Sequence, residues 1–123
     1  MRKLLVLCTA ACALIGTADF SNAICLTGGG SATCGSGMCM SSSLRDIDVT
    51  WVGPGGAQCC DQITIFVDEG CDGGWAQLDV VDCSTSSYSY CGKANTDYKF
   101  KIVYSKNGSQ SAPDIITNCV NCN

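Results

Sequence analysis

The sequence contains no histidine and little positive charge. Without histidine, the chain lacks the commonest general base and cannot build a Ser-His-Asp triad. The residues after position 23 hold five Lys or Arg against ten Asp or Glu. This balance argues against nucleic acid as a partner, because neutralising phosphates needs clustered positive charge. We therefore expect a protein that is not an enzyme, has no cofactor and binds no nucleic acid.

Apolar runs are also short, and the longest one covers residues 4–15. It follows a basic Met-Arg-Lys start and precedes Ser21-Asn22-Ala23, which carries small residues at the positions that a signal peptidase reads. A membrane-spanning helix needs about 20 apolar residues, which is longer than this run. The pattern predicts a signal peptide over residues 1–23, a secreted, extracellular protein and no membrane span in the mature chain.

Ten cysteines follow the predicted signal peptide, and an even number at this density indicates a disulfide framework. They are Cys25, Cys34, Cys39, Cys59, Cys60, Cys71, Cys83, Cys91, Cys119 and Cys122. Cys119 and Cys122 have CxxC spacing, but the chain offers neither a second CxxC nor histidine for zinc. We expect no metal site here, and no helix signal favours redox catalysis.

The rest of the chain has the patterns of strands and turns. Residues 24–37 are rich in Gly and Ser and are predicted to be a cysteine-containing arm. From residue 38, apolar residues recur with period two, and no helical period is sustained. The predicted strands include 47–51, 63–67, 75–81, 86–91, 98–104 and 112–120. We expect an all-β domain over residues 38–123, a seven-stranded antiparallel β-sandwich stapled by disulfides.

The alternation also assigns side chains to the core or the surface. Lys99 and Lys101 are expected to be exposed, and Phe66 lies on an outer face. The residues expected to be buried are Ile47, Val49, Trp51, Ile63, Ile65, Val67, Tyr98, Phe100 and Ile102.

Several segments resemble a known family. They are Val49-Thr50-Trp51 before a Pro/Gly loop, Asp72-Gly73-Gly74-Trp75, residues 95–102 (Asn-Thr-Asp-Tyr-Lys-Phe-Lys-Ile) and residues 107–113 (Asn-Gly-Ser-Gln-Ser-Ala-Pro). Their order is similar to that of a fibronectin type III domain over about residues 38–120, although most members have few cysteines. The resemblance implies a core role for Trp51, a Tyr98 that hydrogen-bonds to the preceding corner, and a binding or adhesion module.

The expected strand directions divide the cysteines between the two ends of the sandwich. One group is Cys25, Cys34, Cys39, Cys59, Cys60 and Cys83, and the other is Cys71, Cys91, Cys119 and Cys122. We expect Cys83 to pair with Cys59 or Cys60. Cys71 or Cys91 should pair with Cys119 or Cys122. A disulfide between the groups would contradict this assignment, because a strand is longer than a disulfide can span.

Few other residues suggest chemistry. Asp68, Glu69 and Asp72 could offer oxygens to calcium, but they fit no EF-hand pattern and are expected to form a solvated acidic turn. Serine clusters at 41–43 and 84–87 have no base nearby in the sequence. Asn107-Gly108-Ser109 matches the N-glycosylation sequon and also a hairpin turn.

Three functions remain open after this reasoning. The first is an extracellular binding or adhesion module whose partner is a protein or a glycan. The second is a structural subunit of an extracellular filament or matrix, which binds copies of itself through the arm or an edge strand. The third is a small secreted effector or inhibitor that presents one stapled loop.

Overall fold

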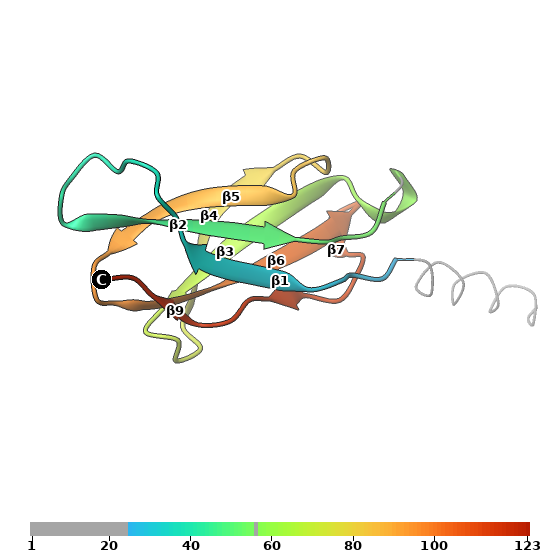
Figure 1. Cartoon of the computed structure of the whole chain (residues 1–123). Coiled ribbons are helices and arrows are strands. Elements are labelled where there is room, and N and C mark those ends of the chain that lie inside the picture. Colours follow the sequence, from blue (N-terminus) through green and yellow to red (C-terminus); the bar gives the residue numbers. More distant parts are fainter. Residues whose placement is uncertain (1–24, 56) are drawn as a thin grey trace, which may run out of the picture.

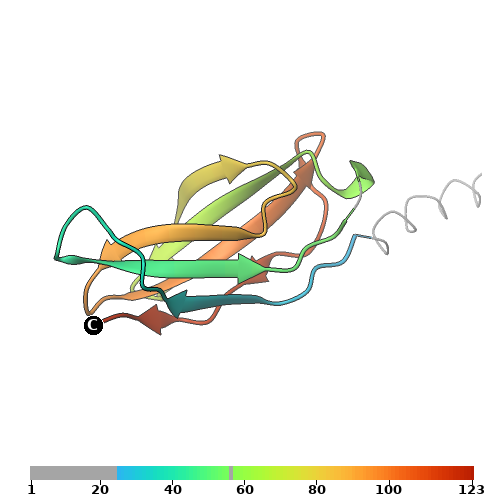
Figure 2. The same cartoon turned by 45° about the horizontal axis from the view of Figure 1, so that its top comes forward.

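The computed structural model describes residues 25–55 and 57–123, where strands and one short 3-10 helix are the regular elements. The strands form two antiparallel sheets that face each other as two layers (Figure 1, Figure 2). This arrangement confirms the all-β class and is sandwich-like. The predicted signal peptide lies outside the described residues. No helix in the described chain is both long enough and apolar enough to cross a membrane.

The first sheet has the strand order β1-β2-β5. Its strands are β1 (Gly30–Cys34), β2 (Leu44–Trp51) and β5 (Ser87–Lys93). In β2, apolar Ile47, Val49 and Trp51 alternate with polar residues, which suits a strand with one buried face.

The second sheet has the order β4-β3-β6, and three short strands pair with the remaining edge of β6. Its strands are β3 (Gln62–Glu69), β4 (Trp75–Val81), β6 (Asp97–Lys106), β7 (Ser109–Gln110), β8 (Ile115–Ile116) and β9 (Val120–Asn121). The 3-10 helix η1 (Ala57–Cys59) precedes β3.

The core lies between the two sheets. All nine residues that the alternation assigned to the core are at most 7% exposed, so this prediction is confirmed. Trp51 Nε1 donates a hydrogen bond to Tyr104 Oη over 3.1 Å. Because β2 and β6 belong to different sheets, this bond joins the two layers and satisfies both polar groups inside the core.

The segment predicted to be an arm is a strand over part of its length, which corrects that prediction. Residues 30–34 pair in antiparallel register with β2. On its other side, Asn118 Oδ1 accepts from Ala32 N over 3.0 Å, and Asn118 Nδ2 donates to Ala32 O over 2.9 Å. These bonds satisfy the backbone N–H and C=O of Ala32, and a Gly/Ser-rich sequence does not predict such partners.

The last predicted strand, 112–120, is broken in the structure. Within this range only β8 and the first residue of β9 are strand, and they pair with parts of the β6 edge, as β7 does just before it. The described chain has nine strands rather than seven. Pro113 lacks an N–H for a ladder, and the Thr117 hydroxyl accepts from Phe100 N over 3.0 Å in place of a backbone group. Proline and side-chain hydrogen bonds thus interrupt the pairing.

A buried tyrosine fixes the corner at which the chain passes from the first sheet to the second. Tyr98 is 1% exposed, and the backbone N–H of Lys93 donates to Tyr98 Oη over 2.9 Å. A Cβ placed on Gly92 would lie 2.6 Å from the Tyr98 ring, so only glycine allows this approach. The position agrees with the role expected for Tyr98.

Candidate functional site

All ten predicted cysteines form disulfides. The five pairs are Cys25–Cys59, Cys34–Cys122, Cys39–Cys91, Cys60–Cys83 and Cys71–Cys119. Two of these pairs, Cys60–Cys83 and Cys71–Cys119, agree with the expected partners. Five disulfides in so small a domain suggest an oxidising, extracellular environment.

Two disulfides contradict the predicted division into ends. Cys34–Cys122 and Cys39–Cys91 each join cysteines from different predicted groups. The reason is β1, which runs along β2 and carries the chain from one end of the sandwich to the other before residue 35 (Figure 1). A disulfide cannot span the length of a strand, as the prediction assumed, but the prediction did not include the strand within residues 24–37.

The CxxC pair at the C-terminus is divided between two disulfides. Cys119 bonds to Cys71 and Cys122 to Cys34. Among the described residues, no group of three or more Cys, Asp, Glu or His could hold a metal ion.

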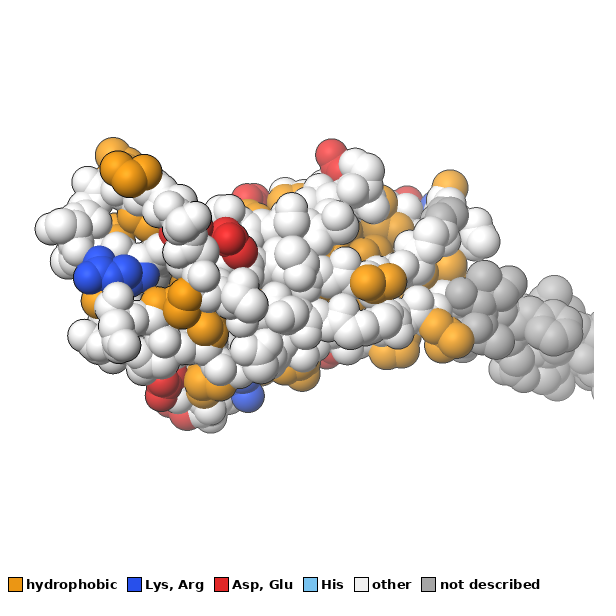
Figure 3. All heavy atoms as spheres, in the orientation of Figure 1, with side chains coloured by type: hydrophobic (Ala, Val, Ile, Leu, Met, Phe, Trp, Pro, Cys, Tyr) orange, Lys and Arg blue, Asp and Glu red, His pale blue; other side chains and the backbone are white. Residues whose placement is uncertain are grey.

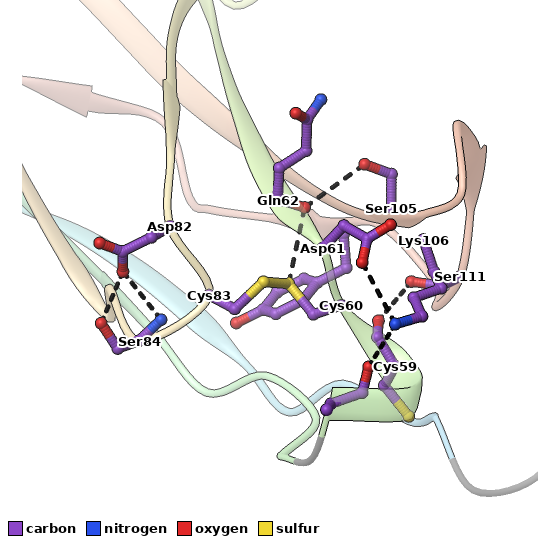
Figure 4. Close-up of a disulfide and its surroundings, with 12 residues drawn as sticks. Cys59, Cys60, Asp61, Gln62, Asp82, Cys83, Ser84, Ser105, Lys106 and Ser111 are labelled. Atoms are coloured by element: carbon purple, nitrogen blue, oxygen red, sulfur yellow. Dashed lines mark hydrogen bonds and ion pairs between the residues drawn. A yellow bond between two sulfur atoms is a disulfide. The ribbon is translucent and has the colours of Figure 1, made fainter.

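Loops meet around the Cys60–Cys83 disulfide at the end of the sandwich that holds the β6–β7 hairpin (Figure 4). They form a hollow of about 530 Å³. It is lined by Pro54, Gly55, Ala57, Cys60, Asp61, Cys83, Ser84 and Lys106.

The charges in this hollow already bind each other and the backbone. Lys106 Nζ lies 3.2 Å from Asp61 Oδ1 and donates to Ala57 O over 2.8 Å. A hydrogen bond from Asn107 N and the neighbouring Lys106 hold the pKa of Asp61 below its ordinary value. These contacts tie the hairpin to the preceding loop, and the hollow is better explained as a scaffold than as a ligand pocket.

The serines near this end are also occupied. Ser84 Oγ donates to Asp82 Oδ1 over 2.5 Å, and Ser111 Oγ donates to Cys59 O over 2.5 Å (Figure 4). Hydrogen bonds from Ser84 and Thr85 lower the pKa of Asp82, which makes this carboxylate a weaker base. The arrangement caps a turn and does not activate a nucleophile.

The predicted acidic turn is only partly solvated. Asp68 is fully buried and accepts from Gly73 N over 2.7 Å and Asp72 N over 3.3 Å. Burial alone would raise the pKa of Asp68, but the hydrogen bonds from Gly73 and Asp72 outweigh it and lower the pKa. Glu69 lies 3.0 Å from Lys93 Nζ at the surface. Asp68 therefore closes the β3–β4 turn, and its oxygens are not free for calcium.

Asn107 lies at the tip of the β6–β7 hairpin and is exposed. Asn107 and Gly108 have φ values of 54° and 80°, which suit an Asn-Gly hairpin turn. The hairpin interpretation is therefore supported, and the sequon is accessible.

The outer face of the second sheet is the candidate binding surface. We call it the aromatic–lysine face and define it by six of the outward side chains of β3, β4 and β6, which are Thr64, Phe66, Trp75, Gln77, Lys99 and Lys101. The buried Asp68 belongs to the same side of the sheet, because the register pairs it with Trp75 and Lys99. The register aligns Phe66 between Gln77 and Lys101, so an amide, a ring and an ammonium group form one row across three strands.

The two lysines of this face lie against aromatic rings. Lys101 Nζ is 4.9 Å from the centroids of both Phe66 and Trp75. Lys99 Nζ is 5.5 Å from the Trp75 centroid and 3.9 Å from Asp68 Oδ2. Both lysines are half-buried, which corrects the expectation that they are exposed. Their stems and ammonium groups cover apolar rings that would otherwise face water.

Sequence reasoning found only part of this face. Alternation placed Phe66, Lys99 and Lys101 on an outer surface, but it gave no reason to bring Trp75 beside them. The available signal was Trp75 itself, a large aromatic residue at the start of a strand directly after a turn. The strand order β4-β3-β6 was needed to show that one ammonium group serves two rings.

No protein-family model matches this chain, and no curated protein matches its sequence.

Proposed function

We propose that this protein is a secreted, non-catalytic binding module that engages its partner with the aromatic–lysine face. One observation carries the proposal: Lys101 has its ammonium group between two half-buried rings. No carboxylate of the described residues lies within 4.0 Å of that ammonium group. The ammonium groups of Lys93, Lys99 and Lys106, in contrast, each have a carboxylate within this distance. A cation that lies against two rings without an acidic partner within 4.0 Å, on a partly apolar surface, suits binding.

The proposal includes a fibronectin type III-like sandwich. Two features support it: the division of the strands into β1-β2-β5 and β4-β3-β6 with its short partners, and the hydrogen bond between Lys93 N and Tyr98 Oη. Secretion is supported by the predicted signal peptide and by the five disulfides.

The filament alternative has less support. Residues 30–34 of the proposed arm already pair with β2. The outer edges of β4 and β5 remain unpaired within the two sheets of the described chain. On β4, a register shift against β3 between Ile65 and Phe66 and the exposed Asp79 both hinder pairing with another strand. A concentration-dependent polymer in size-exclusion chromatography would favour this alternative, and a monomer would favour the binding module.

The stapled-loop alternative has a specific observation in its favour. Residues 35–43 are tied to β5 by Cys39–Cys91, and Met38 and Met40 on either side of Cys39 are 96% and 101% exposed. Figure 3 shows hydrophobic side chains at the tip of this projecting loop. The loop is therefore the competing binding surface.

A binding experiment with two matched variants separates the face from the loop. The disulfide-bonded protein is tested by biolayer interferometry against polygalacturonate, dextran sulfate, neutral dextran and polyglutamate. The face variant is Trp75→Ala/Lys101→Gln, and the loop variant is Met38→Ser/Met40→Ser, each shown to be folded by its thermal unfolding. Binding that the face variant loses and the loop variant keeps supports the proposal. Binding lost only in the loop variant, or to no polymer at all, contradicts it.

A further inference from the structure

We infer that the partner of the aromatic–lysine face is an anionic polysaccharide, an inference that rests on the proposed function above. The argument uses the charge of the face, the side chains around its rings and the state of its backbone. The first two indicate the charge and the chemical groups of the partner, and the third disfavours a peptide.

Charge selects an anionic partner. The chain after residue 23 carries twice as many acidic as basic residues, yet two of its five basic residues lie on this face. The carboxylate of Asp68 lies 3.9 Å from Lys99 Nζ and compensates that lysine, whereas Lys101 has no carboxylate of the described residues within 4.0 Å. The face is therefore locally positive on an acidic protein, and a partner with negative charge is complementary to it.

The side chains around the lysines match the groups of a sugar. Phe66 and Trp75 are only half-buried, so the parts of their rings that the lysines leave uncovered offer apolar surface to the C–H faces of a pyranose. The contacts with the rings also position the ammonium group of Lys101. Gln77 and Thr64 lie beside Phe66 and can hydrogen-bond to hydroxyls. Because Lys101 already packs against both rings, binding of an anion should cost less side-chain entropy than binding to a fully exposed lysine.

The state of the backbone disfavours an acidic peptide. Strands β3 and β6 are paired on both sides, so their N–H and C=O groups are used within the sheet. A peptide lying across this face would lose water from its own backbone without gaining partners, which is costly. A polysaccharide has no such backbone and can leave its remaining hydroxyls in solvent.

The shape of the surface agrees with an extended polymer. Four hollows of the described residues lie at the sandwich ends and beside residues 35–43, and Phe66, Trp75 and Lys101 line none of these four. A ligand therefore lies along the face and does not insert a group into a cavity.

The test uses isothermal titration of the disulfide-bonded protein with oligogalacturonate, its methyl ester, dextran sulfate and polyglutamate. Oligogalacturonate or dextran sulfate should bind, and which of the two binds identifies carboxylate or sulfate as the anion. The methyl ester should not bind, because esterification removes the charge. Lys101→Gln should weaken binding on the order of tenfold, the loss expected for one charge-assisted hydrogen bond.

Lys93→Gln is the matched control, since it removes the same charge from an exposed site outside the face and should leave the affinity unchanged. Equal binding of the methyl ester, or tighter binding of polyglutamate that depends on Lys101, would overturn the polysaccharide while leaving the face as the binding site. Binding unaffected by Lys101→Gln or Trp75→Ala would overturn both proposals.

Discussion

The outer face of the first sheet carries hydroxyls and carboxylates, whereas that of the second carries rings and lysines. Seven outward residues in the middle of β1, β2 and β5 are Ser31, Thr33, Asp46, Asp48, Thr50, Ser87 and Ser89, and Leu44, Cys91 and Lys93 follow toward one end. The side of the molecule with β1 and β2 in front is accordingly mostly neither charged nor hydrophobic, with a few carboxylates (Figure 3). The inner faces are alike, because both must fill one core. Core packing therefore fixed one half of each strand and left the other half free for function.

The largest expected effect comes from the disulfide with the longest sequence separation, which joins the two layers. Cys34–Cys122 ties β1 of the first sheet to the segment after β9, with a sequence separation of 88 residues. Replacing both cysteines with serine should lower the free energy of unfolding by about 4 kcal/mol, since the disulfide restricts a long loop of the unfolded chain. Urea unfolding measures this loss.

Cys60–Cys83 links residues only 23 apart on the second sheet and is the matched comparison. Its double serine variant should lose about 3 kcal/mol. Reduction of all disulfides should abolish cooperative unfolding, and thiol titration of the denatured, unreduced mature protein should find almost no free thiol. A reduced protein that still unfolds cooperatively would contradict this view of the fold.

The two tryptophans separate the inner from the outer face. Trp51→Ala should cost about 3–5 kcal/mol, because Trp51 is 4% exposed and its removal leaves a cavity and an unpartnered Tyr104 hydroxyl. Trp75→Ala should cost no more than about 1.5 kcal/mol, since Trp75 is half-buried. The comparison uses urea unfolding of both variants. Equal losses would mean that the aromatic–lysine face is part of the core and not a free surface.

A smaller effect is expected at the corner between the sheets. Tyr98→Phe keeps the buried ring but leaves the Lys93 N–H without its acceptor, which should cost about 1–2 kcal/mol. Tyr90→Phe is the control, because Tyr90 packs edge-on against Tyr98 and Phe100 and keeps those ring contacts as phenylalanine. A Tyr98→Phe variant as stable as the parent in thermal unfolding would contradict a stabilising role for this hydrogen bond at the corner.

The most gradual effect is the response to acid. Hydrogen bonds lower the pKa values of Asp61, Asp68 and Asp82 in the folded state. Carboxylates of this kind stabilise the fold above their unfolded pKa of about 3.9, and the contribution is lost as pH falls through the folded pKa. The urea concentration at the midpoint of unfolding should therefore decrease once the pH is below about 4. In Asp68→Asn this decline should be shallower, and parallel curves for the two proteins would contradict the role of Asp68.

The sequence predicted the inner faces of β2, β3 and β6 well, because burial imposes a period of two on these strands. It predicted Ile47, Val49 and Trp51 as buried, and it identified the ten cysteines, since both depend on residue type and local spacing. It did not find β1, because glycine and serine carry no strand preference. Residues 30–34 are a strand only because β2 and Asn118 provide partners for their backbone.

The disulfide pairing and the candidate site depended on which residues the fold brings next to each other. The long strands do carry the chain from one end of the sandwich to the other, as expected. Because β1 was not predicted, Cys34 and Cys39 were assigned to the wrong end. For the same reason, Phe66, Trp75 and Lys101 were separate observations in the sequence and became one surface only in the sheet. The sequence by itself determined an all-β, disulfide-bonded fold with a defined core. The tertiary structure decided which cysteines meet and which cation lies between two rings, because strand order places together residues that are distant along the chain.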